Sequence, residues 1–243
     1  MIFLTGCAIS PERIQPGPRE VAVTDPAWPG ASFVLWQPCT TEHAEQLAAR
    51  AKGDARDAVR GASCFAVLSM QSKKQARKLA YAKQGRELAE LAAAKFPESG
   101  LAHYLVAYLT GLEAENDPLR GLGLVKKIER EALLAARLNP VVDNGGPDRM
   151  LGELYLRAPA FPTSVGDVTN SIDHYRRAVE EAPGFLENRL GLAQALLADE
   201  QLGPACSSLR ECFANMTPSD SDKEIWLKSL QLMKKLCSEQ KGR

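Results

Sequence analysis

The chain has 243 residues, 45% hydrophobic and 25% charged, and its 30 basic residues balance 30 acidic ones. This length gives one large or two small domains a substantial core. A formal net charge of zero argues against nucleic acid as the main partner, because phosphate binding needs a basic surface. Aromatic residues make up only 6% while alanine and leucine dominate, so the composition favours packed helices over a β-sandwich.

The first ten residues, MIFLTGCAIS, are mostly apolar, and Leu4-Thr5-Gly6-Cys7 resembles the lipobox of bacterial lipoproteins. In that family the cysteine becomes the lipidated first residue of the mature chain, which implies lipidation at Cys7. The basic region and the longer apolar region of a signal peptide do not precede it here, so a chance match is the alternative. The polar, proline-rich stretch that follows is typical of a tether. No apolar run is long enough to span a membrane, so we expect attachment by the lipid anchor only.

Residues 25–38, DPAWPGASFVLWQP, carry Trp28, Phe33 and Trp36 and are too apolar for a simple tether. We predict an extended strap that lies in a groove between helices and hides its tryptophans; a partner-docking patch is the alternative. The chain therefore divides into residues 1–40, which hold the lipobox-like start, tether and strap, and residues 41–243, a single helical domain.

Prolines punctuate that domain at similar places. Each of the first three closes an amphipathic run and has an alanine five residues before it. The prolines are Pro97, Pro140, Pro183 and Pro218, and the alanines are Ala92, Ala135 and Ala178. A proline that ends every second helix, after a small residue, is the tetratricopeptide (TPR) pattern.

Large-small pairs support the same repeat at Val106-Ala107, Leu151-Gly152 and Leu192-Ala193. A small residue at this position lets the partner helix approach closely. The sequence thus predicts an all-α, TPR-like solenoid of helical hairpins, about ten helices in all. An ordinary alanine-rich bundle is the alternative.

The unit that ends at Pro183 is longer than the usual length of about 34 residues, and residues 158–166, APAFPTSVG, account for the excess. Pro159 and Pro162 should end the preceding helix near Arg157. Asp167 should cap the next helix, and Gly166 should give the chain freedom to turn.

The unit that ends at Pro140 is enlarged as well, around residues 111–124, so both extra loops should lie along one edge of the solenoid. Insertions of this kind often carry binding sites; loops that merely fill space are the alternative. The insertion at 158–166 contains Pro159, Phe161, Pro162 and Val165 and no charge. We expect it to line the mouth of a mostly apolar cavity or groove.

Residues 145–197 resemble the central segment of the TatT-like lipoproteins, the periplasmic T component of TRAP transporters. The matching positions are Gly146, Arg149, Leu151, Gly152, Tyr155, Ala158, Pro159, Gly166, Asp167 and Pro183. The resemblance covers about a fifth of the chain, and other bacterial repeat lipoproteins share versions of it. It implies a helical, lipid-anchored protein in the periplasm that works beside a substrate-binding protein and holds a small apolar or organic-acid ligand. A general scaffold in envelope assembly is the alternative.

Six cysteines stand at 7, 39, 64, 206, 212 and 237. A helical hairpin that turns near Gly53 would bring Cys39 and Cys64 within reach of a disulfide. Cys206 and Cys237 form a weaker candidate pair, because a turn near Pro218 leaves them out of register. If Cys7 is lipidated, one cysteine remains without a partner within the monomer.

The sequence contains none of the common catalytic motifs and no cysteine or histidine spacing typical of zinc. His43, His103 and His174 fall in helical segments; we expect His103 to line a groove or to pack between helices, and His174 to lie on an exposed face. The predicted function is therefore non-catalytic, without cofactor or metal. The identity of the ligand and self-association into a homo-oligomer stay open.

Overall fold

The computed structural model describes residues 21–215, 226–227, 230–231, 233–234 and 237. Its elements are β1 (Val21–Thr24), β2 (Ser32–Leu35), α1 (Thr41–Arg50), α2 (Ala55–Gln71), α3 (Gln75–Lys95), α4 (Gly100–Asn116), α5 (Pro118–Leu138), α6 (Gly146–Arg157), α7 (Val168–Glu181), α8 (Leu186–Ala198) and α9 (Leu202–Asn215). The all-α prediction is confirmed, with nine helices in the described part of the chain. Cys7 and Pro218 lie outside the described residues.

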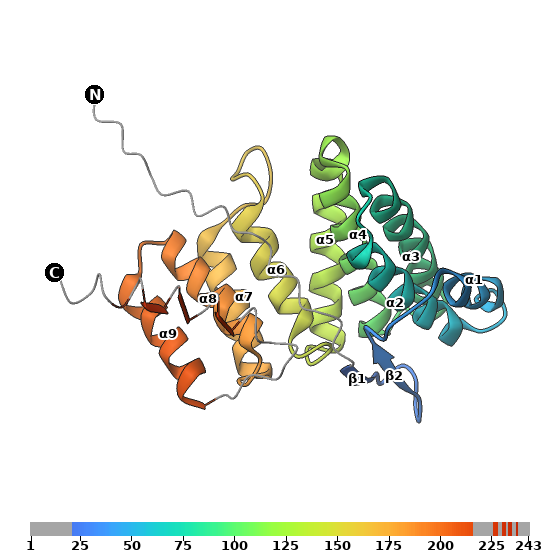
Figure 1. Ribbon diagram of the computed structural model, residues 1–243, viewed down its shortest axis with the longest axis horizontal. Coiled ribbons are helices and arrows are strands. Elements are labelled where there is room, and N and C mark those ends of the chain that lie inside the picture. Colours follow the sequence, from blue (N-terminus) through green and yellow to red (C-terminus); the bar gives the residue numbers. More distant parts are fainter. Residues whose placement is uncertain (1–20, 216–225, 228–229, 232, 235–236, 238–243) are drawn as a thin grey trace.

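The helices follow one another across the molecule as hairpins, from α1 at one end to α9 at the other (Figure 1). In each hairpin the first helix packs on the second: α2 on α3, α4 on α5, α6 on α7 and α8 on α9. The first helices also contact one another, α2 with α4 and α6 with α8. This stacking of hairpins is the solenoid that the phased prolines predict.

Three second helices, α3, α5 and α7, end in the same way. Their C-cap residues Phe96, Asn139 and Ala182 have φ of −131°, −155° and −141° with ψ of 73°, 80° and 78°. Each cap donates its N–H to the carbonyl of the repeated alanine, Ala92, Ala135 or Ala178. The cause is the proline that follows each cap, because proline excludes the helical conformation from the residue before it.

The first insertion is not a loop, which corrects the expectation for residues 111–124. Instead α4 continues to Asn116 and α5 starts at Pro118, so Asp117 alone connects them. Proline fits the first position of a helix, where its missing N–H is not needed. The extra residues therefore lengthen both helices.

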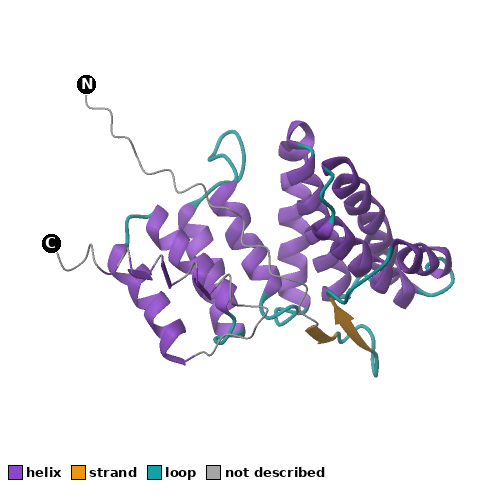
Figure 2. Cartoon of the chain, viewed as in Figure 1, coloured by secondary structure: helices purple, strands orange, loops and turns teal. Residues whose placement is uncertain are grey.

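The second insertion is a loop, as predicted, and it rises above the helices in Figure 2. Helix α6 ends at Arg157, and the Asp167 side chain caps α7 by accepting from the Asn170 N–H at 2.9 Å. Gly166 acts differently from the expectation: a Cβ there would clash with the carbonyl oxygen of Ala158 and lie 2.8 Å from that of Pro159. The position needs glycine for close backbone approach, not for a left-handed turn.

The N-terminal strap is more regular than expected, because β1 and β2 form an antiparallel pair that runs from Val21 opposite Leu35 to Thr24 opposite Ser32. Its tryptophans are buried as predicted, Trp28 at 5% and Trp36 at 6% exposure. Each indole N–H reaches a partner far along the chain: Trp28 donates to Ser99 Oγ at 2.9 Å and Trp36 to Asp143 Oδ1 at 3.0 Å.

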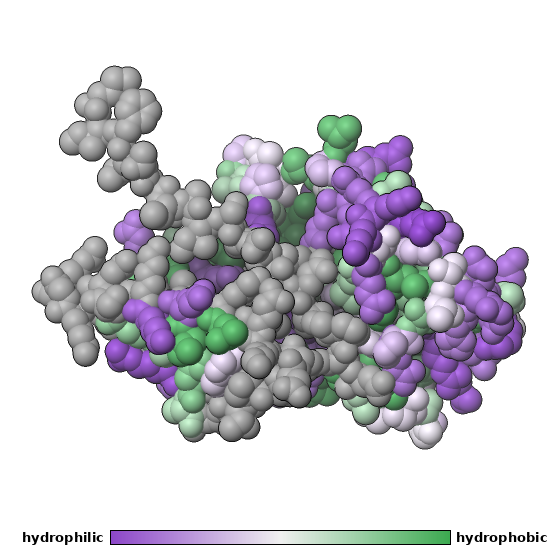
Figure 3. Space-filling model, viewed as in Figure 1, coloured by the Kyte–Doolittle hydropathy of each residue, from purple (hydrophilic) through white to green (hydrophobic). Residues whose placement is uncertain are grey.

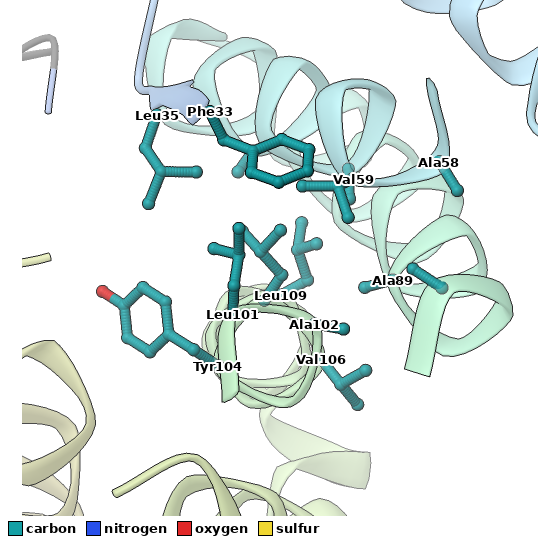
Figure 4. Packing of buried hydrophobic residues seen from close by; sticks show 14 of the residues in the cluster. Phe33, Leu35, Ala58, Val59, Ala89, Leu101, Ala102, Tyr104, Val106 and Leu109 are labelled. Atoms are coloured by element: carbon teal, nitrogen blue, oxygen red, sulfur yellow. The ribbon is translucent and has the colours of Figure 1, made fainter. Parts of the chain in front are cut away.

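The largest core cluster surrounds α4. In Figure 4, Phe33 and Leu35 of β2 pack above Leu101 and Leu109, while Tyr104 points to the side of α4 away from Ala89. Hydrophilic side chains dominate the surface over α1 to α3 (Figure 3). No helix among the described residues is long and apolar enough to cross a membrane.

Two disulfides join both candidate cysteine pairs, including Cys206 and Cys237, the weaker candidate. Cys39 and Cys64 have Cα atoms 5.5 Å apart and connect the start of α1 to α2. Cys206 of α9 is bonded to Cys237, with Cα atoms 5.6 Å apart. The first bond closes a loop of 25 residues, which stabilises the fold by about 3 kcal/mol in the chain-entropy picture.

Candidate binding groove

A groove of about 740 Å³ opens along the first helices of three successive hairpins. Its walls come mainly from α4, the first half of α5, α6 and α8. Further lining residues come from other elements: Val21, Trp36, Met70, Asp143, Ala158, Pro159, Tyr175 and Phe185. This volume is typical of ligand-binding pockets. Many of the lining side chains are aromatic or aliphatic; Leu122 is exposed and Tyr108 and Met150 are partly exposed, so apolar groups can leave water there.

At one end of the groove, the Asp143 carboxylate accepts hydrogen bonds from three parts of the chain. Its carboxylate accepts from Trp36 Nε1 at 3.0 Å, from the Tyr104 hydroxyl at 2.5 Å and from Arg149 Nη2 at 2.7 Å. Burial raises the pKa of Tyr104 well above its usual range, and the charge of Asp143 adds to the effect. Tyr104 therefore stays a neutral donor, and the three elements that carry the donors are fixed to one another.

The backbone at this point is left-handed over three consecutive residues. Asp143, Asn144 and Gly145 have φ of 49°, 56° and 76°. A Cβ on Gly145 would lie 2.9 Å from the carbonyl oxygen of Ala178, so only glycine fits there. Such a run costs free energy and persists only where its surroundings hold it, which Arg149 does by donating to the carbonyls of Asp143 and Asn144 at 3.1 Å.

Arg149 is the motif residue with the most partners. Besides Asp143, it donates to Asn188 Oδ1 at 3.0 Å and covers the Phe185 ring at 4.7 Å from its centroid. Burial opposes the charged form, but the Asp143 carboxylate and further neighbours, Tyr104 and Glu187 among them, together outweigh burial and raise the pKa of Arg149. Arg149 thus stays charged and ties α6 to the start of α8.

Tyr175, which the sequence reasoning missed, fills the space between two glycines. A Cβ on Gly152 would lie 2.6 Å from its ring, and one on Gly191 would overlap the ring. The Tyr175 hydroxyl donates to Glu153 Oε2 at 2.9 Å. The expectation that Gly152 allows close helix approach is confirmed, and the neighbour is this ring.

Other motif residues are structural. Leu151 is fully buried, Gly146 lies against the Tyr104 ring, and the Tyr155 hydroxyl donates to Glu129 Oε1 at 2.7 Å. Pro183 follows the end of α7, and its carbonyl accepts from Arg189 Nε at 2.9 Å.

The 158–166 loop contributes to the groove less than expected. Ala158 and Pro159 line it, but Phe161, Pro162 and Val165 are not among its described lining residues. Phe161 points into solvent with 88% of its surface exposed. Val165 packs on the Leu151 and Tyr155 cluster, because the loop folds back over the end of α6.

Two histidines form buried pairs away from the groove. His103 packs between α4 and α5, as expected, with Nδ1 at 2.6 Å from Glu131 Oε2. His174 is 8% exposed and lies 2.7 Å from Asp148 Oδ1, which corrects the prediction of an exposed face. Among the described residues no group of three or more potential ligands could hold a metal ion.

Neither protein-family models nor curated proteins provide a match to this chain. Among solved structures it is similar to a thermophilic TPR protein from Thermus thermophilus, with a TM-score of 0.50 and 16% identity, over 79% of this chain and 100% of that chain. Likeness at this identity concerns the fold alone. The chain thus has the fold of a TPR-like helical solenoid.

Proposed function

We propose that this protein is a non-catalytic binding module that holds a partner segment or ligand in the groove along α4, α6 and α8. The observation that carries the proposal is the groove itself: about 740 Å³ in volume, with one end fixed by the Asp143 network. A pre-organised wall lowers the entropy lost on binding. His103 and His174, the histidines of the described hairpins, are engaged in pairs outside the groove.

The setting we propose is the bacterial periplasm, with a lipid anchor at Cys7 and a place as an adaptor beside a TRAP-type substrate-binding protein. The resemblance of residues 145–197 to TatT-like lipoproteins supports it. Two disulfides support an oxidising compartment, where such bonds persist. A general envelope scaffold is the second candidate, favoured by the likeness to a TPR protein.

Two glycines provide a matched test of the groove. Gly111 lines it, Gly123 of α5 is not among its described lining residues, and a Cβ at either position meets nothing within 4 Å. Both sit inside helices, so replacing either glycine should stabilise its helix by about 1 kcal/mol at most. The variants Gly111→Trp and Gly123→Trp thus differ mainly in whether the new ring enters the groove.

The neutral apolar dye N-phenyl-1-naphthylamine serves as the probe, through its fluorescence on titration with protein. We expect wild type and Gly123→Trp to bind it alike and Gly111→Trp to lose about tenfold in affinity or more, which corresponds to about 1.4 kcal/mol. Equal binding by all three would reject the groove as the site.

The anchor has its own test. Cys7→Ser in the full precursor should release the protein from the membrane fraction into the soluble periplasmic fraction. A wild type found wholly soluble would end the lipoprotein proposal and leave the groove proposal untouched.

A further inference from the structure

The β1–β2 hairpin supplies part of the groove wall. Val21, the first residue of β1, and Trp36, which directly follows β2, both line the groove. Val21 pairs with Leu35, so the two lining residues lie together at the open end of the hairpin. The other described lining residues come from α2 to α8 and the loops between them. One side of the groove is therefore formed by a segment outside the row of helices (Figure 1).

Trp36 is held in the wall in an unfavourable backbone conformation. Its φ is 62°, in the left-handed region that is rare for a bulky residue and costs about 1–2 kcal/mol. Its indole N–H donates to Asp143, its ring lies 4.7 Å from the Tyr108 ring between centroids, and its backbone N–H donates to Ser63 Oγ at 3.2 Å. Such a conformation persists only where its surroundings hold it, so the position of Trp36 depends on the hairpin that precedes it as well as on these contacts.

The turn end of the hairpin is attached at a separate place, the start of α4. The Asp25 carboxylate accepts from the Leu101 N–H at 2.7 Å and from the Ser99 hydroxyl at 3.2 Å. The Trp28 indole donates to Ser99 Oγ and stacks on the Phe96 ring at 3.9 Å between centroids. None of these residues is among the described lining residues of the groove. The hairpin thus connects a buried attachment to the wall of the groove.

The hairpin depends on the helices for its structure. A two-stranded hairpin is marginally stable in water by itself, and here Val23, Phe33 and Leu35 pack into the core cluster around α4. The next fixed point of the chain is the disulfide of Cys39. The segment before it forms a unit that can open while the helices stay folded. Each opening removes its share of the groove wall.

We propose that occupancy of the groove and docking of the β1–β2 hairpin are coupled, with Asp25 and Trp28 as positioning residues that keep Val21 and Trp36 in the wall. This inference rests on the proposed function and adds a control of the groove to it. A ligand that needs the complete wall binds only the docked state, so it raises the free energy of opening by mass action. By linkage, a weakened attachment lowers the affinity for the ligand.

Hydrogen exchange of the wild-type chain tests the coupling without any substitution. The probe is N-phenyl-1-naphthylamine at about ten times its dissociation constant, and exchange is followed where its rate reports the opening equilibrium. We expect the amides of the β1–β2 pair to exchange about tenfold more slowly with the dye, which is the mass-action factor. Amides of α1, which contributes no described lining residue, should keep their rates. Equal slowing in the hairpin and in α1 would mean that the dye only stabilises the whole fold, and would overturn the coupling.

A variant of the attachment tests the reverse direction. Asp25→Ala combined with Trp28→Ala leaves every described lining residue unchanged, and we expect the folded variant to bind the dye about tenfold more weakly or worse. The matched control is Leu47→Ala, which removes a buried side chain from the cluster of α1 and α2. It should lower stability and leave the dye affinity as in wild type. Circular dichroism checks that both proteins are folded; if the double variant does not fold, exchange of the wild type still decides.

The outcomes separate this inference from the proposed function. Dye binding with unchanged exchange in the hairpin, or with normal affinity in the double variant, would overturn the coupling and keep the groove. Dye binding that Gly111→Trp leaves intact, or no dye binding at all, would reject the groove and the inference with it.

Discussion

The hairpins α4–α5 and α6–α7 contain the same kind of buried pair in opposite orientation. In the first, the histidine is on the first helix, His103, and the acid Glu131 is on the second. In the second, the acid Asp148 is on the first helix and His174 is on the second. His103 and Asp148 each stand three residues before the large-small pair of their hairpin, so they occupy equivalent repeat positions.

The difference shows that the hairpin requires a complementary pair rather than a particular residue. An ionic or hydrogen-bonded pair satisfies two polar groups that would otherwise be buried without partners. A search for identical residues at a fixed spacing does not detect this repeated pair, because the histidine and the acid have exchanged helices between the two hairpins. For the same reason His174 was predicted to be exposed although it is buried.

Removing Asp148 should have the largest effect on stability. This carboxylate is 4% exposed and accepts from both His174 and Arg177 Nε, the latter at 3.1 Å. We expect Asp148→Ala to lower the free energy of unfolding by about 3 kcal/mol, since it leaves the buried His174 ring without this acceptor and removes the ion-pair partner of the half-exposed Arg177. Urea denaturation measures this loss.

The control is Asp173→Ala, which removes an exposed acid from the same helix pair and should lower the free energy of unfolding by less than about 1 kcal/mol. Equal losses for the two variants would refute the structural role of the buried Asp148 pair.

Exchanging His103 and Glu131 should sharpen the comparison between the two hairpins. His103→Glu or Glu131→His alone places two like groups together, and we expect each to cost about 2 kcal/mol. The double variant reproduces the orientation found in α6–α7, and we expect it to recover more than half of the loss. A double-mutant cycle measures this coupling. Additive losses would mean that the two orientations are not interchangeable.

The first pair should also make stability depend on pH. His103 Nδ1 faces the Glu131 carboxylate at 2.6 Å and Nε2 faces the Pro97 carbonyl at 3.0 Å. Both partners are acceptors, so both ring nitrogens donate only in the charged form. Burial opposes that form, but the hydrogen bonds to Glu131 and to the Pro97 carbonyl, together with the charges of Glu131 and Glu98, outweigh burial, and the pKa of His103 is raised. Arg130 also pairs with Glu131.

A histidine whose pKa is raised in the folded state stabilises the fold. Its contribution to the free energy of unfolding is complete below the ordinary histidine pKa of about 6.5. The contribution is lost as the pH rises through the pKa of the folded state. The stability advantage of wild type over His103→Gln should therefore be largest near about pH 6 and shrink toward about pH 9. Urea midpoints across this range measure it, with His43→Gln at an exposed position as the control. An advantage that grows with pH would contradict the charged assignment.

The two insertions should give the smallest effects. Leu119, at the start of α5, is 98% exposed, and Phe161, in the 158–166 loop, is 88% exposed. Leu119→Ser and Phe161→Ser should each change the free energy of unfolding by less than about 0.5 kcal/mol. A larger loss for Phe161→Ser would show that the loop packs on the fold through its tip.

The sequence predicted the repeat because its determinants are local. Each proline fixes the residue before it, and the buried alanines and Gly152 mark the helix contacts. The conformation of only one insertion was predictable from its prolines, since Pro118 starts a helix whereas Pro159 follows the C-cap of one. The Asp143 network was not predictable, because Trp36, Tyr104 and Arg149 meet only in the folded chain.

The most direct test of the groove uses methionine methyl groups. The chain has five methionines; Met70 and Met150 line the groove, and Met233 packs on the cluster of α8 and α9. In ¹³C-methyl NMR with N-phenyl-1-naphthylamine, we predict that the Met70 and Met150 signals shift in proportion to saturation while Met233 stays in place. Saturable binding that leaves both Met70 and Met150 unmoved would contradict the account.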